Sequence, residues 1–180
     1  MILPGHKVGY GDIEIEGEKI SRVDLRQQAY DSKARLVMPG LINCHGHTAM
    51  TLVRGLGSGL PLQRWLEEAI FPVEAKMTPA DIVAGMTWGA MEMLAGGTTA
   101  VADMYDFPGT CGERLAEIGM KGRVCRVGLS FVPGRLDDCI SFTRTFNAPR
   151  PNLPNSLLAD ICVHSEYLTD EAFCRGLAEA

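Results

Sequence analysis

Several common signatures are missing from this chain of 180 residues. It has no Gly-x-Gly-x-x-Gly, Gly-x-x-x-x-Gly-Lys-Ser/Thr or Gly-x-Ser-x-Gly motif, so a nucleotide-phosphate loop and an elbow-type serine hydrolase lose their main support. No uninterrupted apolar run approaches the roughly 18 residues of a membrane span, and the N-terminus lacks the basic start and long apolar centre of a signal peptide. We therefore expect no membrane partner and a cytoplasmic location.

Basic residues and cysteine pairs are also scarce. The 17 Lys and Arg residues are outnumbered by 22 Asp and Glu residues, and the net charge of −5 argues against nucleic acid as a partner. None of the six cysteines forms a Cys-x-x-Cys pair. In a cytosolic protein they are expected to be reduced, partly buried thiols, and neither a disulfide framework nor a structural zinc site is indicated.

The pattern of apolar residues predicts an α/β protein. Residues 1–38 are predicted to form β-strands, because apolar and polar residues alternate in "DIEIEGEKISRVD", with Glu16-Gly17-Glu18 as the hairpin turn. Four further strands, each followed by helical sequence, are predicted near 36–43, 98–104, 123–131 and 157–164. This order implies parallel strands joined by crossover helices, in either an open doubly wound sheet or a (β/α)8 barrel. Because only about four β/α units are present, a barrel would be half built.

Helix-terminus signals support several of these units. A helix is predicted to begin with Thr78 as its N-cap and Pro79 at its first position, and to stop at Gly96. Further helices are predicted over 60–70, 111–119, 136–146 and from Thr169 onward.

The most informative residues are two of the four histidines, which are separated by one residue in "PGLINCHGH". His45 and His47 follow an apolar strand, and side chains at i and i+2 of an extended segment point to the same side. Neutral imidazole is a natural ligand for zinc, iron or nickel, so the pair can share one metal ion. His164, at the end of a later strand, is either a third ligand or a histidine that contacts substrate or makes a hydrogen bond.

These residues lie in a longer pattern. The segments "VMPGLINCHGH", "LQRWLEE", "FPVEAK" and "GGTTAVADMY" together resemble the amidohydrolase superfamily, and within it the deaminases of 5-methylthioadenosine and S-adenosylhomocysteine. The resemblance implies a barrel over residues 39–180, preceded by part of a small β-sandwich over residues 1–38. It also implies a metal-dependent hydrolytic deaminase that acts on purine nucleosides. One departure is Gly46, where the family usually has Thr between the paired histidines.

The resemblance implies roles for seven residues. His45 and His47 would bind one divalent metal ion, zinc first and iron, manganese or nickel as alternatives. The residues implied to contact the substrate are Trp65, Glu74, Arg126, Arg135 and His164. An inward-facing arginine within an apolar strand needs a partner, which independently favours a polar ligand or carboxylate beside Arg126.

The family's other metal ligands and its general acid/base glutamate come from later strands, so we expect no catalytic acid or base before Ala180. Alone, this chain is expected to bind metal weakly, to show little or no activity, and to associate through open sheet edges, as in a homo-oligomer. Alternatives are a cytosine or guanine deaminase, a triazine chlorohydrolase, a non-enzymatic remnant, and an unrelated α/β binding protein.

Overall fold

The computed structural model describes residues 2–3, 5, 7–27, 33, 35–105, 111–149, 157–165, 167 and 169–180. The chain divides into two compact units, Met1–Gly40 and Leu41–Ala180, and each is described by itself. Within the described ranges, no helix is both long and apolar enough to cross a membrane.

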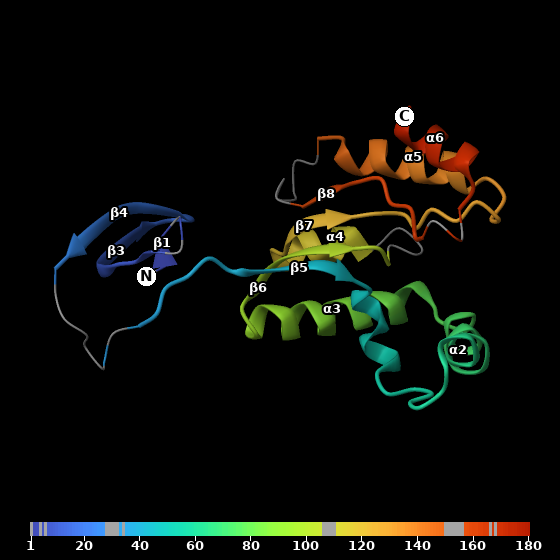
Figure 1. The fold of residues 1–180 in the computed structure, drawn as a ribbon, viewed down its shortest axis with the longest axis horizontal. Helices are drawn as coiled ribbons and strands as arrows, with labels where there is room; N and C mark the ends of the chain where they lie inside the picture. The colour runs from blue at the N-terminus through green and yellow to red at the C-terminus, as the bar shows by residue number, and fades with distance from the viewer. Residues whose placement is uncertain are drawn as a thin grey trace. The chain divides into compact units, whose positions relative to one another are not determined.

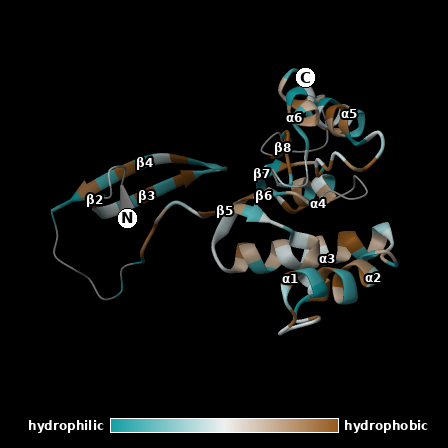
Figure 2. Cartoon of the chain, turned by 45° about the vertical axis from the view of Figure 1, so that its right-hand side comes forward, coloured by the Kyte–Doolittle hydropathy of each residue, from teal (hydrophilic) through white to brown (hydrophobic). Residues whose placement is uncertain are grey.

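The unit Met1–Gly40 is built from β-hairpins. β1 (Ile2–Leu3) pairs with β2 (Lys7–Val8), and β3 (Tyr10–Glu16) pairs antiparallel with β4 (Lys19–Arg26). Gly17 has a φ of 60°, which a glycine adopts at little cost, so the predicted hairpin turn is confirmed. Figure 2 shows hydrophilic and hydrophobic residues interleaved along β3 and β4.

The unit Leu41–Ala180 contains a parallel sheet, as the α/β pattern predicts. Its strands lie in sequence order (Figure 1): β5 (Leu41–Gly46), β6 (Thr98–Asp103), β7 (Lys121–Val124) and β8 (Leu157–Ala159). Several predicted boundaries are wrong. The first strand begins at Leu41 and not near 36, and it continues to Gly46. β7 and β8 end several residues early, with an isolated bridge between Gly128 and Val163 beyond them.

The longest helix, α3 (Pro79–Ala95), confirms its prediction. The Thr78 hydroxyl accepts a hydrogen bond from the Asp81 N–H, and the Asp81 carboxylate accepts one from the Thr78 N–H, so both groups of a capping box are present. The helices that follow are α4 (Cys111–Ile118), α5 (Arg135–Asn147) and α6 (Glu171–Ala178). α6 begins at Glu171, with Asp170 as its N-cap, and not at the predicted Thr169.

The segment between β5 and α3 is less regular than predicted. A 3-10 turn, η1 (Thr48–Val53), follows β5. The single helix predicted over 60–70 is instead three short pieces, α1 (Leu62–Arg64), the π-helical η2 (Trp65–Ile70) and α2 (Phe71–Glu74). Pro72 lacks the N–H that would complete regular α-helical bonding here, which favours the wider π-helical turn.

Helices α3, α4 and α5 bury their apolar faces against one side of the sheet. The largest fully buried side chains of this core include Met86, Leu115, Met120, Leu157 and Val101. α6 packs on α5 through Phe173, Leu177 and Cys139.

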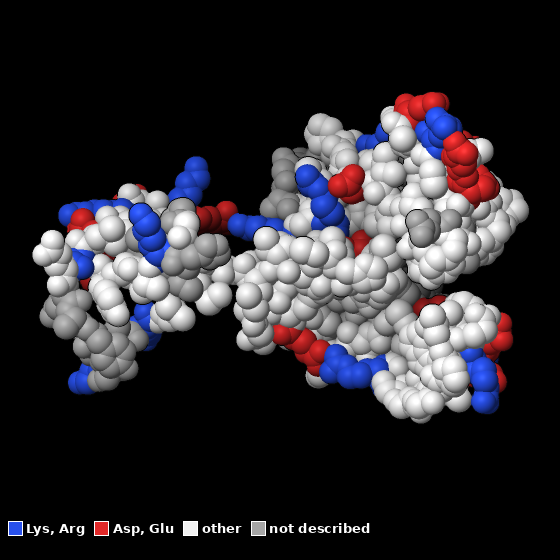
Figure 3. Space-filling view, viewed as in Figure 1, with Lys and Arg blue, Asp and Glu red and all other residues white. Residues whose placement is uncertain are grey.

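The surface of this unit mixes both signs of charge. Figure 3 shows acidic and basic side chains next to each other on the face that it presents. Exposed ion pairs include Arg54–Glu92 and Arg64–Glu68. Such pairs contribute little to stability because water screens them.

Candidate active site

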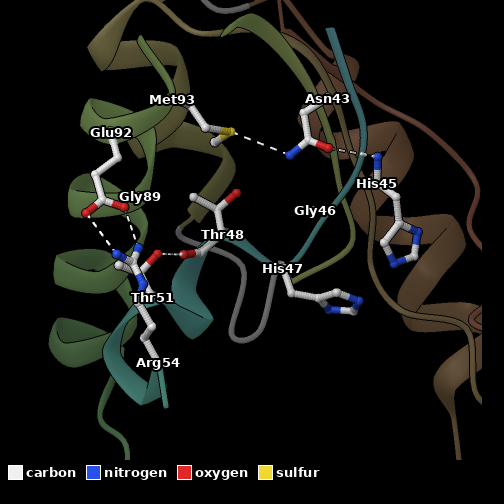
Figure 4. A pocket seen from close by; sticks show the side chains of 10 residues that line it. All are labelled: Asn43, His45, Gly46, His47, Thr48, Thr51, Arg54, Gly89, Glu92 and Met93. Atoms are coloured by element: carbon white, nitrogen blue, oxygen red, sulfur yellow. Dashed lines mark hydrogen bonds and ion pairs between the residues drawn. The ribbon is translucent and has the colours of Figure 1, made fainter. Parts of the chain in front are cut away.

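Two imidazoles meet at the carboxyl end of β5. His45 lies in the strand and is exposed, while His47 follows the strand directly and is half-buried. Their ring centroids are 5.1 Å apart, and Figure 4 shows the rings next to each other. Two imidazoles that bind one zinc ion at about 2.1 Å in tetrahedral geometry have centroids about 5 Å apart. The separation of the two rings therefore fits a shared metal ion.

A buried carboxylate holds the residue after this pair. Asp103, at the end of β6, is only 2% exposed. Its Oδ2 accepts hydrogen bonds from the Thr48 N–H at 2.8 Å and from the Thr48 hydroxyl, and its Oδ1 accepts one from the Tyr105 N–H at 2.9 Å. Asp103 therefore fixes the backbone at both Thr48, which lies after the end of β5, and Tyr105, which lies after the end of β6.

Gly46 lets this carboxylate approach the histidine segment. A Cβ at Gly46 would lie 3.1 Å from Asp103 Oδ2 and 3.2 Å from Val101 Cγ2, closer than ordinary contacts. The Gly46 carbonyl also accepts a hydrogen bond from the Met104 N–H at 3.0 Å. The close packing of β5 on β6 gives a physical reason for glycine between the two histidines.

Burial shifts the pKa values of two groups at this site, His47 and Asp103. It lowers the pKa of His47, and the neighbouring His45 and His164 lower it further because like charges repel. The neutral imidazole that results is the form that binds a metal. Burial also raises the pKa of Asp103, opposed by the hydrogen bonds from Thr48 and Tyr105.

Tyr105 links the histidine pair to Glu74. Its hydroxyl donates a hydrogen bond to Glu74 Oε1, and its ring lies edge-on to the His47 ring, with centroids 6.2 Å apart. Burial and the neighbouring Glu74 raise the pKa of Tyr105 well above its usual range, so it stays protonated and can donate. The His164 ring also lies 6.2 Å from that of His47, so the structure brings Glu74, His164 and the histidine pair together.

The two predicted arginines share one carboxylate. Arg126 Nε lies 3.0 Å and Arg135 Nη1 3.1 Å from Asp138 Oδ2. The prediction that Arg126 lies within a strand is wrong, because β7 ends at Val124. Its expected need for a partner is met by Asp138 and by the Phe142 ring, 5.9 Å below the guanidinium. Arg135 is the buried first residue of α5.

The remaining predicted residue, Trp65, is half-buried, and its indole N–H donates to the Leu56 carbonyl at 2.8 Å.

Two cavities adjoin the histidines, and His45 lines both. One of about 420 Å³ lies toward α3 and is drawn in Figure 4. One of about 310 Å³ lies over the ends of β6, β7 and β8.

Sequence reasoning placed Asp103 at the carboxyl end of a strand but assigned no role to Asp103, Thr48 or Tyr105. The signal available was a carboxylate in an otherwise apolar strand, since such a group is buried only with hydrogen-bond partners. One partner, Thr48, lies 55 residues away in the chain, and no local pattern points to it. Among the described residues, no three His, Cys, Asp or Glu side chains are grouped to hold a metal ion.

Comparison with known proteins places this geometry in a family. Residues 36–139 match the sequence profile of the amidohydrolase family. The chain belongs to the amidohydrolase family. Relatives in this family include a 5-methylthioadenosine/S-adenosylhomocysteine deaminase from Acetivibrio thermocellus, 35% identical over 97% of this chain and 41% of the relative. A 5'-deoxyadenosine deaminase from Methanothrix thermoacetophila is 38% identical over 74% of this chain and 33% of the relative.

Solved amidohydrolase structures have the same fold. An adenosine deaminase from Xanthomonas campestris with bound zinc superposes with a TM-score of 0.70 at 28% identity, over 79% of this chain and 33% of that protein. A guanine deaminase from C. acetobutylicum gives a TM-score of 0.71 at 19% identity, over 89% of this chain and 42% of that protein. This chain thus spans less than half the length of the relatives it matches.

Proposed function

We propose that this chain supplies the first part of a metal-dependent hydrolytic deaminase of adenosine-type nucleosides. The observation that carries the proposal is the pair of imidazoles, His45 and His47, at metal-sharing distance at the end of a parallel strand. Relatives that are 35% and 38% identical in sequence are named as deaminases of such nucleosides, which supports this substrate class.

We further propose that Leu41–Ala180 is half of a (β/α)8 barrel. The strands lie side by side in the order in which they occur in the chain, as in a barrel, whereas a doubly wound sheet reverses its order at a switch point. In a barrel the chemistry occurs at the carboxyl ends of the strands, where His45, His47 and Asp103 lie. On this proposal Met1–Gly40 belongs to a small β-sandwich.

His45 and His47 are proposed as two of the metal ligands. A divalent ion such as zinc would supply Lewis acidity, which lowers the pKa of a water molecule enough to give a nucleophile near neutral pH. The protein's part in this step is to keep His47 neutral through burial and to fix its segment through the Thr48–Asp103 hydrogen bonds.

The nucleoside is proposed to bind beside the pair. Glu74 Oε1 is held by Tyr105, and we assign Glu74 Oε2 as the acceptor for ribose hydroxyls. His164, 6.2 Å from the His47 ring, is placed to contact the heterocycle. Trp65 would line the pocket, and Arg126 with Arg135 would contact the part of the substrate beyond the ribose.

The test of the metal proposal is zinc binding to the purified chain. Zinc affinity is measured at equilibrium by competition with a chromophoric chelator. The double variant His45→Ala, His47→Ala is expected to bind zinc at least tenfold more weakly than the wild type. The control His164→Asn should bind as the wild type does, since His164 is proposed as a substrate contact. Unchanged zinc affinity in the double variant would refute the ligand assignment.

The second test is ammonia release from 5-methylthioadenosine and S-adenosylhomocysteine by the zinc-loaded chain. No turnover above background is expected, because this chain supplies no proposed general acid or base. Turnover by the wild type that is lost in the His45→Ala variant would contradict the proposed inactivity while supporting the metal assignment.

A further inference from the structure

Two cysteines lie at the carboxyl ends of neighbouring parallel strands. Cys125 follows β7 directly, and Cys162 comes three residues after the end of β8. Val124 pairs with Ala159, and the Asp160 N–H donates to the Val124 carbonyl at 2.9 Å. These bonds hold the two chain segments next to each other at the start of the loop that carries each cysteine.

Hydrogen bonds also hold the two segments together beyond the cysteines. The Gly128 N–H donates to the Cys162 carbonyl at 3.1 Å, and the His164 N–H donates to the Gly128 carbonyl at 3.2 Å. The Val124–Ala159 and Gly128–Val163 pairs put Cys125 opposite Asp160, so Cys125 and Cys162 lie two positions apart along neighbouring segments. The backbone is therefore fixed on both sides of the two cysteines.

Both cysteines line the cavity of about 310 Å³ over the ends of the strands, together with Arg123, Asp160, Cys44 and His45. Each of the two residues is 9% exposed, so a small reagent that enters the cavity can reach them. By contrast, Cys111 and Cys139 are 0% and 2% exposed and are packed in the core.

The two thiols interact and differ in acidity. Contact with the Cys125 thiol, together with the backbone N–H of Gly128, lowers the pKa of Cys162 against the opposing effect of burial. The same thiol–thiol contact, and burial, raise the pKa of Cys125. A pair with one more acidic and one less acidic thiol is suited to thiol–disulfide exchange, because the first attacks as the thiolate and the second resolves the intermediate.

We propose that Cys125 and Cys162 form a reactive dithiol site that low-molecular-weight disulfides oxidise to a Cys125–Cys162 disulfide. The Cys162 thiolate attacks one sulfur of the small disulfide, a mixed disulfide forms, and one small thiolate leaves. Cys125 gives its proton to that departing thiolate and attacks the Cys162 sulfur, which expels the second small thiolate. Two protein thiols are oxidised and one small disulfide is reduced to two thiols.

The disulfide would join the ends of β7 and β8 within a cavity that His45 also lines. Oxidation would therefore reshape the cavity next to the histidine pair without touching either imidazole. The proposal itself needs no metal, and it stands whether or not His45 and His47 bind one.

The test is carried out on the full chain, reduced and kept with a metal chelator, in a Cys44→Ser background that removes the exposed thiol from the same cavity. The protein is treated with oxidised glutathione, remaining thiols are alkylated, and cross-linked peptides are identified by mass spectrometry under non-reducing conditions. We expect a Cys125–Cys162 link. Cys111, Cys139 and Cys174 should form no link, and each should be alkylated either after unfolding or at its ordinary rate.

Two variants separate the roles of the thiols. Cys125→Ser should accumulate a glutathione adduct on Cys162, and Cys162→Ser should lose reaction at Cys125. The matched control Cys174→Ser, a half-buried cysteine on α6, should form the link as the wild type does.

Alkylation of both Cys125 and Cys162 after full treatment would overturn the proposal, as would an adduct on Cys125 but none on Cys162. The link is measured in a chain that keeps both cysteines, so the proposal can still be refuted if one of the variants fails to fold.

Discussion

Replacing Asp103 by Asn removes one acceptor from a carboxylate that receives three hydrogen bonds. Oδ2 accepts both donors of Thr48, and Oδ1 accepts the Tyr105 N–H. Asn has a single carbonyl oxygen, and its amide NH₂ must face a donor wherever the oxygen is placed. At least one buried N–H therefore loses its partner in the Asp103→Asn variant.

The size of this effect follows from the burial of the site. Asp103 is 2% exposed, so water does not replace the lost acceptor. A buried donor left without a partner costs about 1–3 kcal/mol. For a chain of this size each kcal/mol lowers the unfolding midpoint by about 2–4 °C, so we expect a decrease of about 2–12 °C. Zinc affinity should fall as well, because Thr48 anchors the segment that carries His47.

The assay is thermal and urea unfolding followed by circular dichroism, with zinc affinity measured on the same samples below the midpoint. Thr48→Ser keeps the hydroxyl and should stay close to the wild type. Thr48→Val has nearly the same shape without the hydroxyl, and it should lose about 1 kcal/mol. An Asp103→Asn variant as stable as the wild type, within about 0.5 kcal/mol, would refute the anchoring role of the carboxylate.

Four further outcomes are expected. Thr78→Ala should cost about 1 kcal/mol of stability by removing the N-cap of α3. The hydrogen bonds from Thr78 lower the pKa of Asp81, so the contribution of Asp81 to stability is complete at neutral pH and is lost as the pH falls through its folded pKa. The difference in unfolding free energy between the wild type and Asp81→Asn, measured by urea unfolding, should therefore close on acidification. Gly89→Ala should cost about 1–3 kcal/mol in the same assay, because its Cβ would lie 2.8 Å from the Thr48 carbonyl oxygen. Tyr105→Phe removes the hydrogen bond to Glu74 and should weaken binding of a nucleoside, measured by calorimetry, with little change in zinc affinity.

The elements whose ends are encoded locally could be predicted from the sequence. α3 begins and ends where Thr78, Pro79 and Gly96 indicate, because a capping box and a terminal glycine act within one turn of the helix. The hairpin at Gly17 was predictable for the same reason. The position of the histidine pair also followed from local strand geometry.

What could not be predicted depends on contacts between distant segments. β7 includes Gly122 with a φ of 129°, and a Cβ there would lie 1.9 Å from the Val101 carbonyl oxygen on β6. That close approach belongs to the packed sheet and leaves no periodic trace in the sequence. The hydrogen bonds of Asp103 to Thr48 and the ion pair of Arg126 with Asp138 are likewise tertiary features.

The sequential order of the strands has a consequence for how the chain is made. Each strand of the sheet pairs with the strand synthesised just before it, so the pairing partner of each new strand has already been synthesised. At translation speeds of about 5–20 residues per second, the 23 residues from the start of β6 to the start of β7 take about 1–5 s. Because α3 and α4 cover the same face, each β/α unit can dock as it leaves the ribosome, and the sheet grows from one edge during synthesis.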